Sequence, residues 1–168
     1  MLIRRATTED AWVLWQAEVE VARIPGRLAS RVDELVLDAF TAKISELSSA
    51  GSYVVAEEGE KIVGHAFLER MSLAALKHVV HLTVVVHPGY TKRGIGTKLV
   101  RHLQDWARDE RDIRKIELRV RSTNVEAIRL YGRLGFVEEG RFKDRVRLPD
   151  GQFVDDLAMA WFPAVKPG

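Results

Sequence analysis

Residues 87–97 combine glycines with basic side chains in a way that suits an anion. They follow the valine-rich stretch His78–Val86 and read His-Pro-Gly-Tyr-Thr-Lys-Arg-Gly-Ile-Gly-Thr. At the start of a helix the backbone N–H groups have no intrahelical partner, and the helix dipole places partial positive charge beside them. Gly94 and Gly96 let the backbone approach a bulky anion closely. The residue types and their spacing therefore predict a phosphate-binding loop.

Two common nucleotide-binding motifs do not fit this loop. Gly89 and Gly94 are spaced like the glycines of a P-loop, but Ile95 and Gly96 stand where that motif needs Lys and then Ser or Thr. A dinucleotide fingerprint would need its third glycine at Leu99, and it would start directly after the strand. An NTPase and a nicotinamide-dependent enzyme are therefore disfavoured.

A second cluster lies downstream in a predicted helix, Val125–Leu134. Asn124 and Tyr131 are seven positions apart, and seven residues return a helix to nearly the same face, within roughly 20°. Both side chains can therefore face one ligand. A phenol with an ordinary pKa near 10 can donate a proton to a leaving group of similar basicity. Taken alone, a Tyr beside Ile128 and Leu130 is more often a residue packed at a core boundary.

The two clusters together resemble the motifs of the GNAT superfamily of acyl-CoA-dependent N-acetyltransferases. The resemblance covers about Tyr53–Met159. It rests on Val84, Val86, Pro88, Arg93-Gly94-Ile95-Gly96, Asn124, Ala127, Tyr131 and Leu134-Gly135-Phe136. It implies an α/β (α+β) fold, with a central mixed, mostly antiparallel sheet of about seven strands flanked by about four helices and splayed at the CoA site. It also implies acetyl-CoA as the co-substrate.

The resemblance assigns a role to each site residue. Val84 and Val86 would pair through their backbones with the pantetheine arm. The pyrophosphate would be held by backbone N–H groups of Lys92, Arg93, Gly94, Ile95, Gly96 and Thr97. The helix would add the contacts of Asn124, Ala127 and Arg133, the last of these near the adenosine end. Tyr131 would be the catalytic residue that donates a proton to the departing CoA thiolate.

Thr91 departs from the family pattern, because Gln or Arg is usual at this first position of the pyrophosphate motif. Lys92 and Arg93 can compensate, and backbone donors do not depend on the side chain. The sequence therefore predicts weaker CoA binding rather than its loss. The chain has no cysteine, which excludes a thiolate nucleophile and fits direct transfer within a ternary complex.

The acceptor side of the reaction is less defined. The segment 139–159 looks like the branch that acetylates amino acids, polyamines or related primary amines, which predicts a small-molecule partner. Acetylation of a protein N-terminus or lysine stays open, as does acyl-CoA binding without catalysis. Apolar Val80 and Leu82 occupy the positions where family members often carry the general base. Glu69, His78, His81 or a water therefore remain candidates for that role.

Hydrophobic periodicity predicts the elements that position these residues. A first helix begins near Thr8 and ends before Pro25-Gly26. Three more are predicted over about Asp33–Ser48, Ile95–Asp109 and Val125–Leu134. Strands are predicted over Leu2–Ala6, Tyr53–Glu57, Ile62–Leu68, His78–Val86, Lys115–Val120, Phe136–Glu138 and Val154–Trp161. The basic residues Arg141, Lys143, Arg145 and Arg147 alternate, which indicates a solvated strand face, with an anionic substrate or a homodimer contact as alternatives.

Composition sets the class of protein. The 168 residues, of which 46% are apolar and 30% charged, predict one globular domain over 1–168. Without an apolar run that could cross a bilayer or act as a signal peptide, a cytoplasmic location and no membrane partner are expected. No group of His, Asp and Glu has the spacing of a metal site, so no metal is predicted.

The net charge of +2 conceals a division along the chain. Residues 1–60 carry 6 basic and 11 acidic side chains, a net charge of −5, and the remaining 108 residues carry 20 and 13, a net charge of +7. Basic and acidic residues are interleaved without exposed aromatics between them, which argues against a nucleic-acid partner. The acidic N-terminal helices are expected to border the acceptor and to favour a cationic amine.

Overall fold

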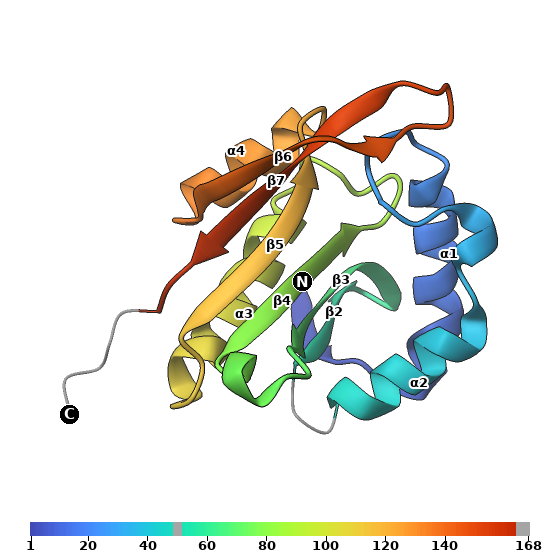
Figure 1. Ribbon diagram of the computed structural model, residues 1–168. Helices are drawn as coiled ribbons and strands as arrows, with labels where there is room; N and C mark the ends of the chain where they lie inside the picture. The colour runs from blue at the N-terminus through green and yellow to red at the C-terminus, as the bar shows by residue number, and fades with distance from the viewer. Residues whose placement is uncertain (49–51, 164–168) are drawn as a thin grey trace.

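A mixed sheet of seven strands lies at the centre of the computed structural model, which describes residues 1–48 and 52–163 (Figure 1). The strands are ordered β1-β2-β3-β4-β5-β7-β6, and only the β4–β5 pair is parallel. Their bounds are Leu2–Arg5, Tyr53–Glu58, Lys61–Arg70, Val79–Val86, Lys115–Arg121, Val137–Arg147 and Phe153–Trp161 for β1 to β7. The mostly antiparallel sheet predicted from the sequence is thus confirmed.

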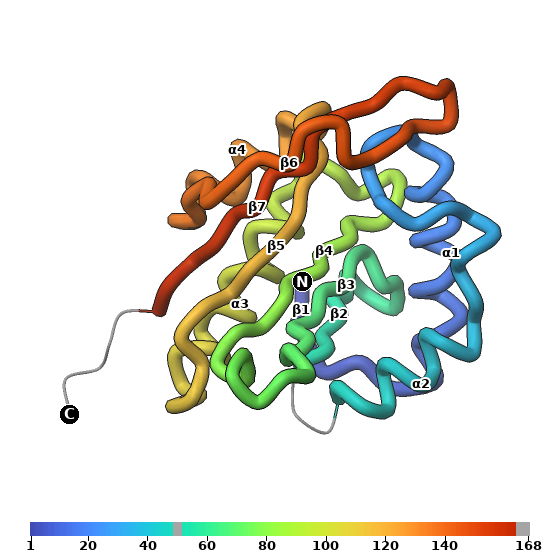
Figure 2. Tube along the Cα trace, viewed as in Figure 1, coloured from blue at the N-terminus to red at the C-terminus, as the bar shows by residue number. Residues whose placement is uncertain are grey.

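Four α-helices in the described residues cover the two faces of this sheet. They are α1 (Ala11–Ala22), α2 (Leu37–Ser48), α3 (Ile95–Asp109) and α4 (Val125–Arg133). Because side chains alternate along a strand, the side chains of β2 pack on both faces of the sheet. Tyr53 and Val55 pack in the cluster with residues of α1 and α2, whereas Val54 and Ala56 pack with α3. The Cα trace shows the same division into helix pairs (Figure 2).

The parallel strands β4 and β5 separate soon after they meet. Their register covers only the pairs Val79–Lys115, Val80–Ile116 and His81–Glu117. Beyond His81 the two strands diverge (Figure 1), and their facing edges are no longer joined by a backbone ladder. The predicted splay is therefore present, and it leaves backbone donors and acceptors of β4 available to a ligand.

The second predicted helix begins later than its hydrophobic pattern indicates. Residues Val32–Glu34 form a single 3-10 turn, which is closed by the Arg31 N–H donating to the Glu34 carboxylate at 2.7 Å. Leu35 then takes an extended conformation with ψ of 105°, so α2 starts only at Leu37. The local side-chain bond prevails here over the helical periodicity. The interrupted segment becomes part of a cavity wall described below.

Two other predictions need correction. The first helical turn is preceded by Thr7 rather than Thr8, and the Asp10 carboxylate accepts the Thr7 N–H at 2.8 Å. The strand predicted as Phe136–Glu138 extends to Arg147, with irregular pairing between Phe142 and Val146. Asp144 lies there with φ of +50°. This bulge interrupts the alternation on which the interpretation of a continuous basic strand face rested.

The described helices include none long and apolar enough to cross a membrane.

Candidate active site

A cavity of about 720 Å³ lies beyond the end of β4, beside the first turn of α3 and α4. The end of β4, the loop 88–94, the start of α3 and α4 contribute to its lining. The structure brings together eleven of the twelve predicted cofactor contacts here: Val84, Val86, Thr91, Lys92, Gly94, Ile95, Gly96, Thr97, Asn124, Ala127 and Arg133. The two sequence motifs therefore form one site, although a strand and a helix separate them in the chain.

Gly94 shapes the loop at the start of α3. It has φ of +77°, a left-handed conformation that glycine adopts without strain. A Cβ added to Gly94 would meet nothing within 4 Å, so the space before it is open. Lys98 is the first α3 residue whose N–H bonds back to the Gly94 carbonyl, at 3.1 Å. The preceding N–H groups are therefore free to receive an anion, which fits a pyrophosphate.

Gly96 also has a packing role, beside the backbone contact that its motif predicts. A Cβ added there would lie 3.2 Å from Leu130 Cδ2 and 3.5 Å from Val86 Cγ2. The absence of a side chain thus permits close packing of α3 against α4 and β4. Gly94 keeps the loop open to a ligand, and Gly96 keeps the two helices close together.

The structure turns Arg93 away from the cavity that holds the other predicted contacts. Its Nη2 lies 2.6 Å from Glu58 Oε2, and its guanidinium stacks 5.4 Å from the centroid of the Tyr90 ring. Its side chain therefore fastens the loop to β2. Lys92 Nζ is mostly exposed and lies 3.3 Å from Glu126 Oε1, so Lys92 is the basic side chain of the pair that lines the cavity.

Asn124 forms the N-terminal cap of α4. Its Oδ1 accepts the Ala127 N–H at 3.4 Å and a hydrogen bond from Arg27 Nη1 at 3.1 Å. The side-chain oxygen is thus used within the protein, and the NH₂ group is what Asn124 can offer to a ligand. Arg27 comes from the segment after α1, so this bond also ties the N-terminal part of the chain to α4.

Tyr131 lies between this cavity and a second one. Its side chain lines both, and the residue is 9% exposed. Burial raises the pKa of Tyr131 to about 12, because the phenolate would lose its hydration. The ring packs against Phe136 with 5.6 Å between centroids. The hydroxyl is consequently protonated throughout the physiological pH range, which suits a proton donor.

The second cavity has a volume of about 620 Å³ and lies between the β4–β5 region and the segment that joins α1 to α2. Both cavities are lined by Arg27, Leu28, Val84, Asn124, Ala127 and Tyr131. Two compartments that meet at a buried phenol can place two reactants on either side of it. After the ligands that the sequence predicts for their residues, we call the first the CoA cavity and the second the acceptor cavity.

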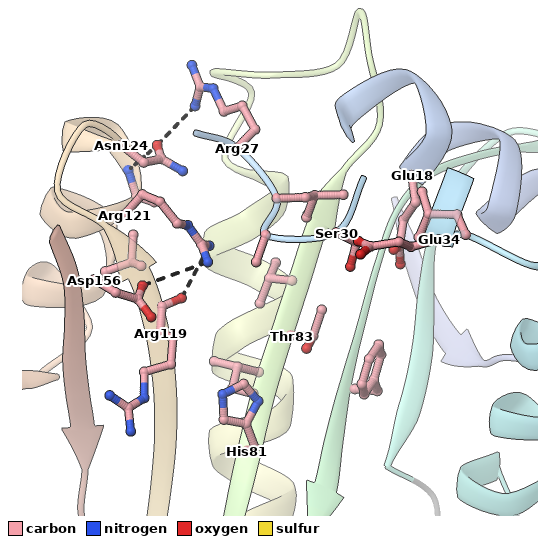
Figure 3. Close-up of a pocket in the computed structure, with 18 of the residues that line it drawn as sticks. Glu18, Arg27, Ser30, Glu34, His81, Thr83, Arg119, Arg121, Asn124 and Asp156 are labelled. Carbon is pink, nitrogen blue, oxygen red and sulfur yellow. Dashed lines mark hydrogen bonds and ion pairs between the residues drawn. The ribbon is translucent and has the colours of Figure 1, made fainter. Parts of the chain in front are cut away.

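The charged residues of the acceptor cavity are distributed on two sides (Figure 3). Glu18 of α1 and Glu34 lie on one side, while Arg119 and Arg121 of β5, with Asp156 of β7, lie on the other. Residues 1–60 also contribute Arg27 and Lys43 to the lining. The N-terminal part of the lining therefore has no net charge, and the acidic border expected from the sequence is limited to Glu18 and Glu34.

Glu18 belongs to a buried chain of hydrogen bonds that the sequence did not reveal. Its Oε1 lies 2.9 Å from His65 Nε2, and His65 Nδ1 lies 3.0 Å from His87 Nε2. His87 Nδ1 in turn lies 3.0 Å from the Ile62 carbonyl oxygen. All three residues are at most 9% exposed. They come from α1, β3 and the end of β4, so only the fold brings them together.

The geometry of these hydrogen bonds determines which atoms of Glu18, His65 and His87 donate and which accept. The Ile62 carbonyl can only accept, so His87 Nδ1 carries a proton. Burial is the main cause that lowers the pKa of His87 to about 3, which leaves its Nε2 unprotonated as an acceptor. His65 Nδ1 must then donate to it, and one proton remains between His65 Nε2 and Glu18 Oε1. The Glu18–His65 contact is therefore a hydrogen bond with one proton between the two atoms, and Glu18 also lines the acceptor cavity.

This arrangement predicts a pH effect on stability. The pKa of His87 is lower in the folded protein than its ordinary value of 6.5, so below pH 6.5 the unfolded chain binds more protons. The free energy of unfolding should therefore fall as the pH decreases, by roughly 2 kcal/mol for His87 between pH 7.5 and 5. Urea denaturation should show a smaller loss for His87→Gln than for the wild type. The exposed His102→Gln should match the wild type, and equal pH dependence of all three would contradict the assignment.

The structure distinguishes the candidates for the general base by whether they line the acceptor cavity. His78 is exposed at the start of β4, and Glu69 pairs with Lys43 at 3.2 Å; neither lines the acceptor cavity. His81 does line it, and burial lowers its pKa, so it is neutral and able to accept a proton. Glu18 is a further candidate with a carboxylate at the same cavity. Neither the sequence position nor the spacing of Glu18 signals this role.

Comparison with known proteins decides the family. The family model described as "Acetyltransferase (GNAT) family" matches residues 13–136, about three quarters of the chain. The chain belongs to the GNAT acetyltransferase family. The family predicted from the sequence is thus confirmed, and with it, at the level of the family, an acyl-CoA-dependent acetyltransferase that uses acetyl-CoA as co-substrate.

The relatives of this GNAT protein differ in their acceptors. It is 38% identical over 89 residues to the N-alpha-acetyltransferase RimI of Mycobacterium tuberculosis, which covers 52% of this chain and 53% of that protein. It is 29% identical over 99 residues to the L-amino acid N-acetyltransferase AaaT of Escherichia coli, covering 59% and 60%. The chain thus spans little more than half the length of these curated relatives.

A solved structure shares almost the whole fold. The putative acetyltransferase yncA from Salmonella typhimurium, described with its cofactor acetyl-CoA, superposes with a TM-score of 0.88. The match covers 100% of this chain and 95% of that one at 23% identity. At this identity the likeness establishes the fold alone. The predicted arrangement of seven strands and four helices is that of GNAT acetyltransferases.

Proposed function

We propose that this GNAT protein transfers the acetyl group of acetyl-CoA to a primary amine of a small molecule. The observation that carries the proposal is the meeting of the CoA and acceptor cavities at Tyr131 and Val84. Bound in the two cavities, a thioester and an amine would be close enough for direct attack. The nitrogen–carbon bond would form as the carbon–sulfur bond breaks, without an acyl-enzyme.

The chain's own residues fit the co-substrate. The open space before Gly94 and the unbonded N–H groups at the start of α3 suit the pyrophosphate. Val84 and Val86 lie on the part of β4 that has separated from β5, where backbone groups can pair with the amides of the pantetheine arm. Arg133, at the end of α4, lines the same cavity and would face the adenosine end.

Proton transfers complete the reaction. Tyr131 would give its proton to the departing thiolate, since its raised pKa keeps the phenol protonated. The attacking amine would lose a proton to a side chain that lines the acceptor cavity, and His81 and Glu18 are the available groups. Both transfers would occur at buried positions, where a fixed donor and acceptor act without solvent reorganisation.

The boundaries of the acceptor cavity favour a small molecule over a protein. Its volume of about 620 Å³ is typical of small-ligand sites. The interrupted segment before α2 and the first turns of α2 contribute Leu35, Val36 and Phe40 to its lining. Acetylation of a protein N-terminus is the second candidate, favoured by the 38% identity to RimI. A cytoplasmic location and a homodimer stay predictions of the sequence.

A thiol-release screen with acetyl-CoA tests the proposal. Amino acids, polyamines, aminoglycosides and short peptides would be compared at equal concentration, with the products verified by mass spectrometry. We expect acetylation of a small primary amine, with at least tenfold lower kcat/KM for peptides, because the walls of the cavity would exclude a long chain. Activity on peptides alone would favour the second function. CoA binding without any transfer would indicate a non-catalytic module.

A further inference from the structure

We infer that the acceptor is an amine that also carries a carboxylate, which Arg121 and Arg119 bind while Glu18 receives the amine. This inference rests on the proposed function and narrows its substrate class to small zwitterions such as free amino acids. Its basis is two arginines of β5 that line the acceptor cavity, the buried Arg121 and the half-buried Arg119, each with one nitrogen that has no hydrogen-bond partner among the described residues.

Arg121 supplies the first of these donors. The residue is 9% exposed, and its Nε is buried without a hydrogen-bond partner. Nη2 donates weakly to the Arg119 carbonyl at 3.5 Å, and Nη1 lies 3.8 Å from Asp156 Oδ1. The latter distance is too long for a hydrogen bond. Because buried N–H groups are almost always paired, a free one in a cavity wall indicates a ligand that accepts hydrogen bonds.

Arg119 supplies the second donor from the same face of β5, two residues away. Its Nη1 is also buried without a partner. The guanidinium lies over the ring of Phe142, 4.3 Å from the centroid, which holds its plane while leaving its N–H edge free. Two guanidinium groups with free edges match the oxygen pair of a carboxylate, the group that arginine binds most specifically.

The other charges of this wall do not neutralise the two arginines. Asp156 lies between Arg121 and Arg145, with 3.6 Å between its Oδ2 and Arg145 Nε. The lowered pKa of His81 keeps this imidazole uncharged. Three guanidinium groups therefore face one carboxylate, which leaves an excess of two positive charges. The local field attracts an anion to this side of the cavity.

The opposite side suits the amine. Glu18 lines the cavity, and its Oε1 lies 2.9 Å from His65 Nε2, which orients the carboxyl. Lys43 of α2 also lines the cavity, and its charge is paired with Glu69 at 3.2 Å. Glu34 is the other acidic residue on this side, and it already accepts the Arg31 N–H. Figure 3 shows these carboxylates across the cavity from Arg121. A ligand with an ammonium at one end and a carboxylate at the other satisfies both sides.

Other amines match this polarity less well. A polyamine would place a second cation beside Arg119 and Arg121, where it would be repelled. A peptide N-terminus would present a neutral amide at the same position and leave the buried N–H groups without a charged partner. The two charged sides therefore select against both classes.

The test compares substrates that differ only in the carboxylate. Each accepted L-amino acid would be assayed beside its decarboxylated amine and its amide, with wild type, Arg121→Gln, Arg121→Lys and Arg119→Gln. We expect the wild type to prefer the amino acid by at least tenfold in kcat/KM. Arg121→Gln and Arg119→Gln should reduce this preference mainly by raising KM for the amino acid, and Arg121→Lys should restore part of it. The matched control is Arg147→Gln, which replaces an exposed arginine at the end of β6 that does not line the cavity.

Two outcomes overturn the inference. The first is equal use of an amino acid and its decarboxylated amine by the wild type, which would leave the proposed function intact. The second is an unchanged preference in both glutamine variants, provided that they bind CoA with wild-type affinity and are therefore folded. If no amine is acetylated, the proposed function fails. Calorimetric titration of amino acids into CoA-saturated protein then tests the carboxylate site. If the wild type binds an amino acid and Arg121→Gln does not, the site is supported. If the wild type binds no amino acid, the inference is overturned.

Discussion

Replacement of Tyr131 by Phe is expected to lower kcat by about a hundredfold or more, while the Kd of CoA changes by less than about threefold. The substitution removes only the hydroxyl, and general acid catalysis contributes 10² to 10⁴ in typical enzymes. The ring would remain packed against Phe136, so the walls of both cavities should keep their shape. Steady-state kinetics with the best amine and a calorimetric titration with CoA measure the two quantities.

The pH dependence adds a second test of Tyr131. With a pKa of about 12, the phenol stays protonated from pH 6 to pH 10, so the ratio of wild-type to variant kcat should be constant over that range. A phenol with an ordinary pKa near 10 would be partly deprotonated near pH 10, and the ratio of wild-type to variant kcat would then fall there. A kcat for Tyr131→Phe within threefold of the wild type at all pH values would remove Tyr131 from the mechanism.

Replacement of Gly94 by Val should reduce the affinity for CoA by at least a hundredfold. Gly94 has φ of +77°, and a β-branched residue is strained in this left-handed region. Its side chain would also project into the open space at the start of α3, where the pyrophosphate is expected to bind. Isothermal titration with CoA is the direct measurement.

A matched variant separates the loss of the site from a loss of stability. Gly59 lies in the turn between β2 and β3 with φ of +63°, and a Cβ there would also meet nothing within 4 Å. Gly59→Val should therefore introduce similar backbone strain without entering the CoA cavity. We expect it to lower the free energy of unfolding about as much as Gly94→Val does, and to bind CoA normally. Equal CoA affinity of both variants would exclude the loop as the pyrophosphate site.

Local patterns in the sequence predicted most of the CoA cavity. Residues 84–97 and 124–133 carry their chemistry in short segments, where residue type and spacing determine which backbone groups are exposed. Arg93 does not line this cavity, and its side chain pairs with Glu58 on a distant strand; the contact of its backbone N–H stays a prediction. The spacing around Arg93 contains no sign of that partner.

The acceptor cavity could be predicted only in part. The −5 charge of residues 1–60 indicated an acidic border, but the link between Glu18, His65 and His87 joins residues 47 and 22 positions apart. The role of β5 was missed for a related reason. Arg119 lies between the apolar Leu118 and Val120 of the predicted strand, and Arg121 follows its predicted end. Only the separation of β4 from β5 places both arginines at a cavity rather than in solvent.

The brief pairing of β4 and β5 has a thermodynamic consequence. Only three residue pairs join the β1–β4 part of the sheet to the part formed by β5, β7 and β6, so a ligand in the gap would act as a missing strand segment between them. A ligand that binds only the folded chain raises the free energy of unfolding by mass action, by about 2.7 kcal/mol at a hundredfold excess over Kd. The lifetime of this protein in a cell would then follow the supply of acetyl-CoA.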